Sequence, residues 1–263
     1  MAGSLIGGLI SDGWNPAKIH IADPDPQQLN TVLQHHPDII ATDDNRTAIE
    51  RADAVILAVK PQILHTVCAE LHTDIQTRKP VVISIAAGVR EKDINRWLGG
   101  HLPIVRCMPN TPALVQSAAT GLFANALVTV WQKELAESIL RAAGITVWVE
   151  NEPLLDAVTA LSGSGPAYYF LVMEAMQAAG EKLGLDTETA RLLTLQTALG
   201  AARLALESEE DAATLRKRVT SKGGTTESAL EVLQQSGLAH HFEQAMQAAA
   251  ERARTLADEL GKH

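Results

Sequence analysis

Short runs of β-branched and other apolar residues, separated by helical patterns, recur through the first 150 residues. Strands that alternate with helices form crossover units, so we expect a mostly parallel, doubly wound sheet over residues 1–150. The runs "VILAV" and "VVISIA" are apolar throughout, which is typical of strands covered on both faces. The expected strands lie in "KIHIAD" (18–23), "ADAVILAVKP" (52–61), "PVVISIAAG" (80–88), "PIVRCMPN" (103–110) and "ITVWVE" (145–150).

After Glu150 no further β-branched run appears, and good helix formers dominate the sequence. Residues 151–263 are therefore predicted to form an all-helical second domain. Its apolar surface is large for its size, so we expect part of it to be shared with a second copy of the chain; an ordinary monomeric bundle is the alternative. The predicted helices are Leu154 to Leu161, Pro166 to Leu183, Thr187 to Glu207, Ala212 to Val219, Thr226 to Gln235 and Ala239 to Leu260.

Several classes of function are disfavoured by composition. A formal net charge of -9 argues against nucleic acid as the main partner, since phosphate binding usually needs a basic face. The apolar runs are too short to span a membrane and no signal sequence leads the chain, so we expect a cytoplasmic protein. Cys68 and Cys107 form no C-x-x-C motif and are expected to be buried, and the histidines form no metal-binding motif.

Polar residues just after the expected strands are the first candidates for ligand binding, because a doubly wound sheet binds ligands at the carboxyl ends of its strands. Asp23 could accept a hydrogen bond from a ribose 2′-hydroxyl, or could be a turn or helix-capping aspartate. Lys60 precedes Pro61, which forces an extended exit from the strand; a solvated lysine is the alternative. Asn110 and Thr111 lie in a loop stiffened by two prolines, which suits ligand positioning or a structural turn.

Two stretches of the helical half are rich in glycine and hydroxyl groups. "ALSGSGPAYYF" (160–170) places a proline near a helix start, where free N–H groups could meet an anion, although a plain bend between helices would look the same. In "VTSKGGTTESAL" (219–230), adjacent glycines before a helix let N–H groups converge on an anion such as a substrate carboxylate. A capped helix start is the alternative there. Neither stretch contains a serine-hydrolase motif, and a polar, glycine-rich site is expected where a cofactor performs the difficult step.

These signatures together resemble one family. "LAVKPQ", "VVISIAAGV", "VRCMPNTPALV", "LSGSGPAYYF" and "VTSKGGTTESAL" are similar, in this order, to the successive motifs of pyrroline-5-carboxylate reductases. The resemblance implies a Rossmann-like domain followed by a helical dimerisation domain. It also implies hydride transfer from NADPH or NADH to the C=N carbon of a cyclic imino acid, giving L-proline. The implied partner is a second copy of the chain, with a ring of dimers common in the family, and the reacting groups meet between two chains.

The start of the sequence departs from the family pattern. Family members begin with a strand and a G-x-G-N-M-[AG] loop, and "MAGSLIGGLI" resembles the continuation of that loop as the body of a helix. Met1 and Ala2 would then be its last two positions. We expect either that the sequence begins at an internal start or that the chain is truncated, with an impaired nucleotide site.

The resemblance also assigns roles position by position. Thr226 matches the threonine thought to hydrogen-bond the imine nitrogen, and is the predicted catalytic residue. Glu209 matches an acidic position near the substrate ring, and Lys222 stands where many relatives have proline. The other predicted substrate-binding residues are Ser221, Gly223, Gly224 and Thr225. The predicted cofactor-binding residues are Met1, Ala2, Asp23, Asn45, Ala58, Val59, Lys60, Pro61, Ala86, Ala87 and Asn110.

Two further points remain open at this stage. Asp23 favours NADH, because a carboxylate would repel the 2′-phosphate of NADPH, although family members often accept both. The competing interpretations are a relative of the β-hydroxyacid dehydrogenases, whose catalytic lysine helix is not found, and a non-catalytic helical module that dimerises without binding a dinucleotide.

Overall fold

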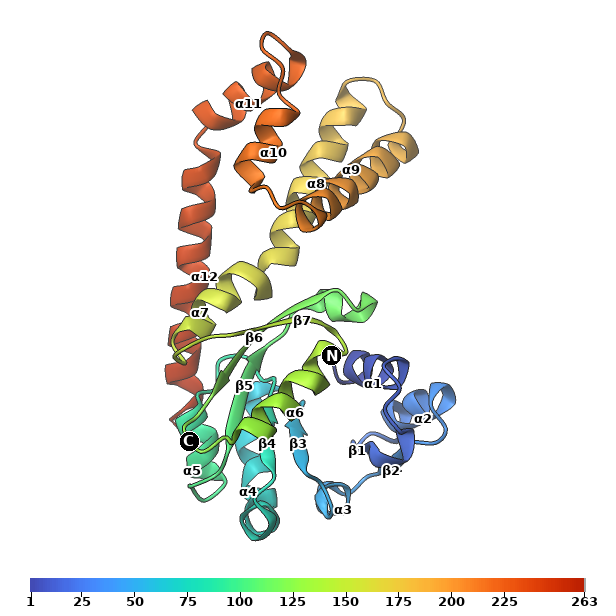
Figure 1. Cartoon of the computed structure of the whole chain (residues 1–263), viewed down its shortest axis with the longest axis vertical. Helices are drawn as coiled ribbons and strands as arrows, with labels where there is room; N and C mark the ends of the chain where they lie inside the picture. The colour runs from blue at the N-terminus through green and yellow to red at the C-terminus, as the bar shows by residue number, and fades with distance from the viewer. Residues whose placement is uncertain (263) are drawn as a thin grey trace. The chain divides into compact units, whose positions relative to one another are not determined.

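The computed structural model describes residues 1–262, which divide into two compact units (Figure 1). The first unit comprises residues 1–164 together with residues 248–262, and the second comprises residues 165–247. The strands, all in the first unit, are β1 (His20–Ala22), β2 (Ile40–Thr42), β3 (Ala54–Leu57), β4 (Val81–Ser84), β5 (Ile104–Met108), β6 (Ala118–Ala124) and β7 (Gly144–Trp148).

The first unit also contains most of the shorter helices. These are α1 (Ala2–Ser11), α2 (Pro26–His35), α3 (Asn45–Ile49), α4 (Pro61–Arg78), α5 (Glu91–Trp97), α6 (Val130–Arg141) and α7 (Leu154–Val158), with 3-10 turns η1 (Pro16–Lys18) and η2 (Thr111–Val115) and a π-helical turn η3 (Thr159–Gly163). The second unit contains α8 (Gly165–Lys182), α9 (Thr187–Glu207), α10 (Ala212–Arg218) and α11 (Thr225–Gln235). Helix α12 (Leu238–Leu260) starts in the second unit and ends in the first.

The predicted α/β class is confirmed by a five-stranded sheet in the order β3-β4-β5-β6-β7. All neighbouring pairs are parallel except β5 and β6, which are antiparallel. Strands β1 and β2 form a separate parallel pair, and no hydrogen bonds join it to the larger sheet within residues 1–262.

Two strands were not predicted, β2 and β6. Strand β6, "AATGLFA", is composed mainly of small residues rather than β-branched ones. The structure explains this composition, because a Cβ on Gly121 would lie 2.7 Å from Cγ1 of Val158 in α7. The close approach of α7 therefore requires a small residue in a strand whose sequence then looks unlike a strand.

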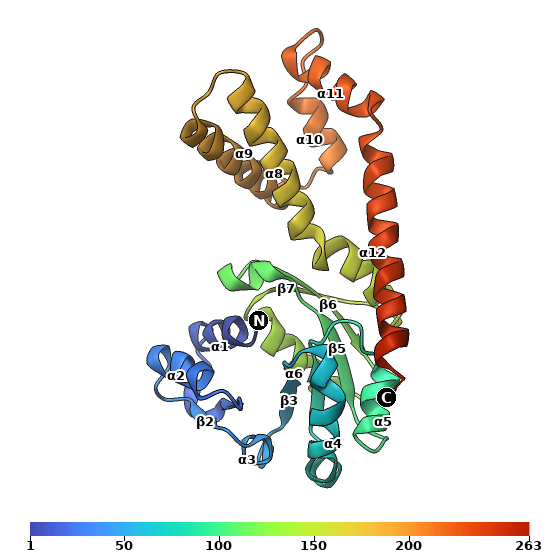
Figure 2. The same ribbon diagram turned by 180° about the vertical axis from the view of Figure 1, so that it is seen from behind.

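Both faces of the sheet are covered, as the apolar strands predict. Within β4, Val81 and Ile83 face one hydrophobic cluster, which includes Leu5 and Leu9 of α1 and residues of α6. Val82 faces a second cluster, built with residues of α4 and α5. Figures 1 and 2 show these two helix layers on opposite sides of the strands.

Helix α1 approaches the end of α6 through a glycine. A Cβ on Gly8 would overlap the carbonyl oxygen of Ala142 and lie 2.7 Å from its carbonyl carbon. Its neighbour Gly7 has open space, since the nearest atom to its Cβ position is Nε2 of His36 at 4.0 Å. Only the second of these adjacent glycines is therefore required by packing.

The helices of the second unit begin and end within two residues of the predicted bounds. Asp186 and Asp211 cap α9 and α10 by accepting hydrogen bonds from the backbone N–H of Thr189 and Thr214. The predicted helix from Leu154 to Leu161 instead changes from α to π geometry at Thr159 and belongs, by packing, to the first unit. The division of function at residue 150 stays a prediction.

The two cysteines are buried, as predicted. Burial raises the pKa of the Cys68 thiol to about 12 and also raises that of Cys107, so neither is a reactive thiolate near neutral pH. Over residues 1–262, no group of three metal-ligating side chains comes together, and none of the helices there has the length and apolar character needed to cross a bilayer.

Candidate functional site

A pocket of about 250 Å³ opens at the carboxyl ends of three neighbouring strands of the first unit. Residues 58–60 follow β3, Ile85 and Ala87 follow β4, and Pro109 follows β5. This is the place where open α/β sheets bind ligands. The full lining is Met1, Ala58, Val59, Lys60, Ile85, Ala87, Met108 and Pro109.

The lining suits a dinucleotide. Met1 is the N-cap of α1 and offers no side-chain cap, so the first N–H groups of that helix can donate to an anion beside the pocket. Lys60, at the N-cap of α4, is the only charged side chain among the eight lining residues. Ile85, Met108 and Pro109 give the rest of the pocket an apolar wall that could cover a flat ring. Five of the predicted cofactor-binding residues are thus brought together here: Met1, Ala58, Val59, Lys60 and Ala87.

Three other predicted cofactor-binding residues are not among the residues that line the pocket. Ala86 is buried in the cluster between the sheet and α4, and faces away from the lining. Pro61 is the first residue of α4. Asn110 is buried, with its Nδ2 donating to Ser162 O at 3.0 Å and its Oδ1 accepting from Ala119 N at 3.0 Å. Its amide therefore ties β6 to the π-helical turn, which favours the structural alternative for the proline-stiffened loop.

Asp23 and Asn45 lie at the carboxyl ends of β1 and β2, outside the lining of the pocket. One carboxylate oxygen of Asp23 accepts from Asp25 N at 2.9 Å, the geometry of an aspartate turn. Asn45 begins α3, and its Nδ2 donates to Glu70 Oε2 at 3.4 Å. Ala2 is the exposed first residue of α1.

The glycine loop of the second unit binds the carboxylate of a residue in its own chain. Gly223 has φ +72°, which favours glycine, and a Cβ on Gly224 would lie 3.0 Å from Ser221 O. The N–H of Gly223 donates to Oε2 of Glu227 at 2.6 Å, while the N–H of Gly224 donates to Ser221 O at 3.0 Å. The loop thus already holds a carboxylate, its own Glu227, for which the sequence suggested no role.

Thr226 lies in the first turn of α11, directly after this loop, and is half-buried, whereas Thr225 and Lys222 are exposed. Glu209 lies at the other end of α10, so a seven-residue helix, about 10 Å long, separates it from the loop. Its neighbour Glu210 reaches along that helix to Arg218, with Oε2 and Nη1 2.7 Å apart. The glycine loop and Thr226 are therefore brought together, and Glu209 is not placed beside them.

The sequence of a curated relative decides the family. The pyrroline-5-carboxylate reductase of Pseudomonas aeruginosa is 49% identical over 262 residues, which cover 100% of this chain and 95% of that protein. The chain belongs to the pyrroline-5-carboxylate reductase family. The reductase of Pasteurella multocida is 42% identical, over 97% of this chain and 94% of that protein.

Family models and solved structures agree with this assignment. Residues 152–256 match the model described as pyrroline-5-carboxylate reductase dimerisation, and residues 1–88 match NADP oxidoreductase, coenzyme F420-dependent. The solved pyrroline-5-carboxylate reductase of Coxiella burnetii has a TM-score of 0.94 and 48% identity, over 97% of this chain and 94% of that one. The Plasmodium falciparum enzyme, solved with NADP bound, has a TM-score of 0.84 and 26% identity, over the same shares. The resemblance of the sequence to this family is thus confirmed, and the β-hydroxyacid dehydrogenase alternative is not needed.

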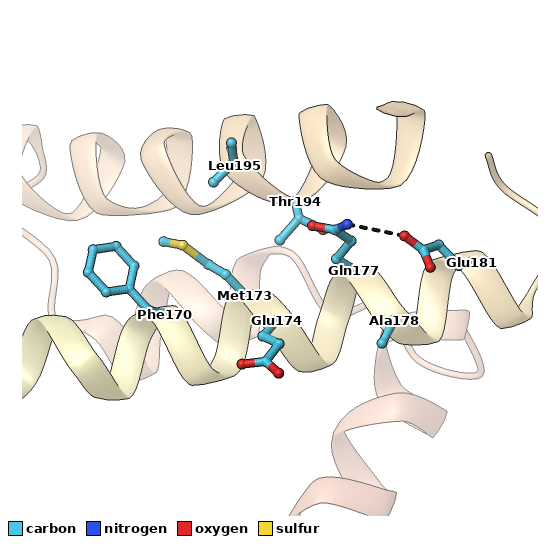
Figure 3. A pocket seen from close by; sticks show the side chains of 8 residues that line it. All are labelled: Phe170, Met173, Glu174, Gln177, Ala178, Glu181, Thr194 and Leu195. Carbon is cyan, nitrogen blue, oxygen red and sulfur yellow. Dashed lines mark hydrogen bonds between the residues drawn. The ribbon is translucent and has the colours of Figure 1, made fainter. Parts of the chain in front are cut away.

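A larger hollow, of about 350 Å³, lies between α8 and α9 of this reductase family member (Figure 3). Phe170, Met173 and Leu195 make it largely apolar, and Gln177 Nε2 donates to Glu181 Oε1 at 3.1 Å along one side. Glu174 is a second acidic residue of its lining. An apolar hollow with two carboxylates would repel an anionic imino acid, so we do not place the substrate there.

A partly buried ion pair joins β5 to the segment before α7. Arg106 Nη1 lies 2.7 Å from Glu152 Oε1, and the same oxygen accepts from Glu91 N at 2.5 Å. Nearby, burial raises the pKa of Asp156, although the charges of Arg106 and Arg254 partly oppose the shift. Asp156 Oδ2 lies 3.9 Å from Nε of Arg254, and no substrate role was predicted for Asp156.

The raised pKa of Asp156 predicts a pH dependence of stability. The folded chain binds the carboxyl proton of Asp156 more tightly than the unfolded chain does, so protonation of Asp156 stabilises the fold. This contribution to the free energy of unfolding is fully present below the unfolded pKa of 3.8 and is lost as pH rises through the raised pKa of the folded chain. In Asp156→Asn, this decline should disappear from urea unfolding curves measured at a series of pH values upward from 3.8. The same change at Asp53, an exposed carboxylate of this unit, serves as the control and should keep the decline.

Proposed function

We propose that this chain reduces 1-pyrroline-5-carboxylate to L-proline, with NADPH or NADH as hydride donor. The observation that supports the proposal most strongly is full-length similarity to pyrroline-5-carboxylate reductases, combined with a pocket at the strand ends where a dinucleotide would bind. In the reaction, hydride adds to the carbon of the C=N bond and the nitrogen gains a proton, which gives the secondary amine of proline. The dinucleotide supplies the hydride when bound.

The residues of the first unit hold the donor. The N-terminal turn of α1 and Lys60 bind phosphate, while Ile85, Ala87 and Pro109 cover the ring from the strand ends. Met1, Ala58 and Val59 complete the proposed cofactor site. Asp23 and Asn45 extend it toward the ribose.

The residues of the second unit hold the acceptor. The N–H groups of Gly223, Gly224 and Thr225, with the hydroxyl of Ser221, bind the carboxylate of the substrate. For the N–H of Gly223 to take part, the Glu227 carboxylate must release it. The hydroxyl of Thr226 donates a hydrogen bond to the imine nitrogen, which makes the C=N carbon a better hydride acceptor. The role of Glu209 near the ring is the least supported part of the assignment, since the structure separates it from the loop by α10.

Assembly is part of the proposal. The dimerisation family match over residues 152–256 supports a homo-oligomer, and the helices of this region expose large apolar side chains, among them Tyr169, Phe170 and Leu192. We propose a homodimer, with a ring of dimers as a further step. A cytoplasmic location, which the sequence predicts, remains part of the proposal.

The test is a spectrophotometric assay of dinucleotide oxidation on addition of 1-pyrroline-5-carboxylate, run with NADPH and with NADH. We expect oxidation that requires the substrate and yields proline in equal amount. Tryptophan fluorescence titrations with each dinucleotide accompany the assay. A folded dimer that neither binds a dinucleotide nor forms proline would overturn the proposal in favour of the non-catalytic helical module.

The position of Asp23 predicts how the two dinucleotides compare. A carboxylate at the end of β1 can accept from a ribose 2′-hydroxyl but repels a 2′-phosphate, so Asp23→Ser should raise kcat/KM for NADPH relative to NADH by about tenfold. Asp25→Ser, two residues away at the N-cap of α2, is the control and should leave the ratio unchanged. If the ratio of kcat/KM for NADPH to that for NADH were the same in both variants, Asp23 would not belong to the cofactor site.

A further inference from the structure

The turn between β4 and α5 has one side on the proposed cofactor pocket and the other on the protein interior. Ile85 and Ala87 line the pocket. The alternate residue Ala86 is buried in the cluster beneath α4 and α5, and so is Val89. Gly88, at the tip of the turn, has φ +71° and therefore needs the conformational freedom of glycine.

The last turns of α12 pack directly on this turn. Cγ and Cδ2 of Leu256 both lie 2.9 Å from the position that a Cβ on Gly88 would occupy. Two residues further along the helix, Asp258 Oδ1 pairs with Nη1 of Arg90 at 2.6 Å. Figures 1 and 2 show this end of α12 beside α5, within the first unit. Helix α12 thus contacts the turn at two places, at Gly88 and at Arg90.

We propose that Leu256 is a positioning residue of the dinucleotide pocket, which keeps Ala87 in place by packing on Gly88. A glycine in the left-handed region has several conformations open to it, and the isobutyl group of Leu256 closes off the space into which the turn would otherwise relax. Displacement of a pocket wall by about 1 Å can cost a large factor in productive binding. The identity of the ligand rests on the proposed function, whereas the contact itself does not.

The matched control is Leu260, one helical turn further along α12. Leu260 is also partly buried, and it packs against the cluster beneath α4 and α5. Leu256→Ala and Leu260→Ala remove the same atoms from the same helix, so both should lose stability. Only Leu256→Ala should raise the Kd for NADPH, by about tenfold, with kcat at saturation changed much less. Equal Kd values in the two variants would overturn the proposal.

Hydrogen exchange tests the contact without any ligand. The backbone N–H of Ile85 donates to Leu57 O at 3.3 Å and reports on the start of the turn. Exchange in residues 85–90 should be about threefold or more faster in Leu256→Ala than in Leu260→Ala. Equal exchange would overturn the positioning role. An unchanged chain that fails to bind NADPH would overturn the proposed function instead, and the exchange measurement would still decide the role of Leu256.

A double-mutant cycle separates this contact from general destabilisation. Gly88→Ala introduces a Cβ against Leu256, and Leu256→Ala removes the atoms that it would meet. The loss of NADPH affinity in the double variant should therefore be smaller than the product of the two single losses. Losses that simply multiply would show that Gly88 and Leu256 act independently.

Discussion

Gly8→Ala should lower the free energy of unfolding by about 2 kcal/mol, whereas Gly7→Ala should raise it by about 0.5 to 1 kcal/mol. The two glycines are neighbours in α1, and in both the alanine improves helix propensity. At Gly8 the new Cβ would meet the backbone carbonyl of Ala142, which cannot rotate away, so α1 must shift from α6. At Gly7 the nearest atom is 4.0 Å away.

Urea unfolding of the two variants, followed by circular dichroism, measures this difference. Gly3→Ala is a second control, because nothing lies within 4 Å of its Cβ position. Since Met1 at the start of α1 lines the pocket, Gly8→Ala should also weaken dinucleotide binding, and Gly7→Ala should not. If both variants gained stability, the close packing of α1 on the end of α6 would be wrong.

Thr226→Ala should lower kcat by about a hundredfold, which is the effect of removing one hydrogen-bond donor to a reacting group. Thr226→Ser keeps the hydroxyl and should retain most of the activity. The N-cap of α11 is Gly224, which has no side-chain cap, so the alanine variant loses no capping bond and should stay folded. The measurement is steady-state kinetics with both variants and a thermal unfolding curve for each.

Thr225→Ala provides the matched control for this prediction. Thr225 precedes Thr226 in the same first helical turn but is exposed. Its variant keeps the backbone N–H that we assign to carboxylate binding, so kcat and the KM for 1-pyrroline-5-carboxylate should both change little. Similar losses of kcat at both positions would contradict the assignment of Thr226 to the imine nitrogen.

Much of the fold was predictable, because burial on both faces leaves a direct mark on sequence. Val81, Val82 and Ile83 face two different clusters, so all three are apolar and β-branched, and the strand is evident. Strand β6 was not evident from the sequence, because the close approach of α7 at Gly121 requires a small residue there, whatever its strand propensity. The antiparallel direction of β6 has no local signal either.

The candidate site was predictable only where backbone position alone matters. Residues that follow β3 and β4, such as Lys60 and Ala87, line the pocket because the strands carry them there. Residues adjacent to the lining residues could not be assigned in this way. Ala86 and Asn110 are each one position from a lining residue, yet both are buried in the protein. Alternation along an extended segment decides which neighbour faces a ligand, and a motif quoted as a block of letters does not contain that information. Glu227 was overlooked as an occupant of the glycine loop because its distance from Gly223 depends on the helix that starts between them.

The first unit is assembled from two stretches of chain that are far apart in sequence. Residues 248–262 pack with residues 1–164, while residues 165–247 form a separate unit. During translation, the first unit therefore cannot fold completely when Ser164 emerges from the ribosome, because the residues from α12 that belong to it have not yet been synthesised. At about 5 to 20 residues per second, the intervening segment takes several seconds to synthesise. During that interval Gly88 and the side chains under α5 lack their cover from Leu256 and Leu260, so the nascent chain exposes a surface that chaperones can recognise.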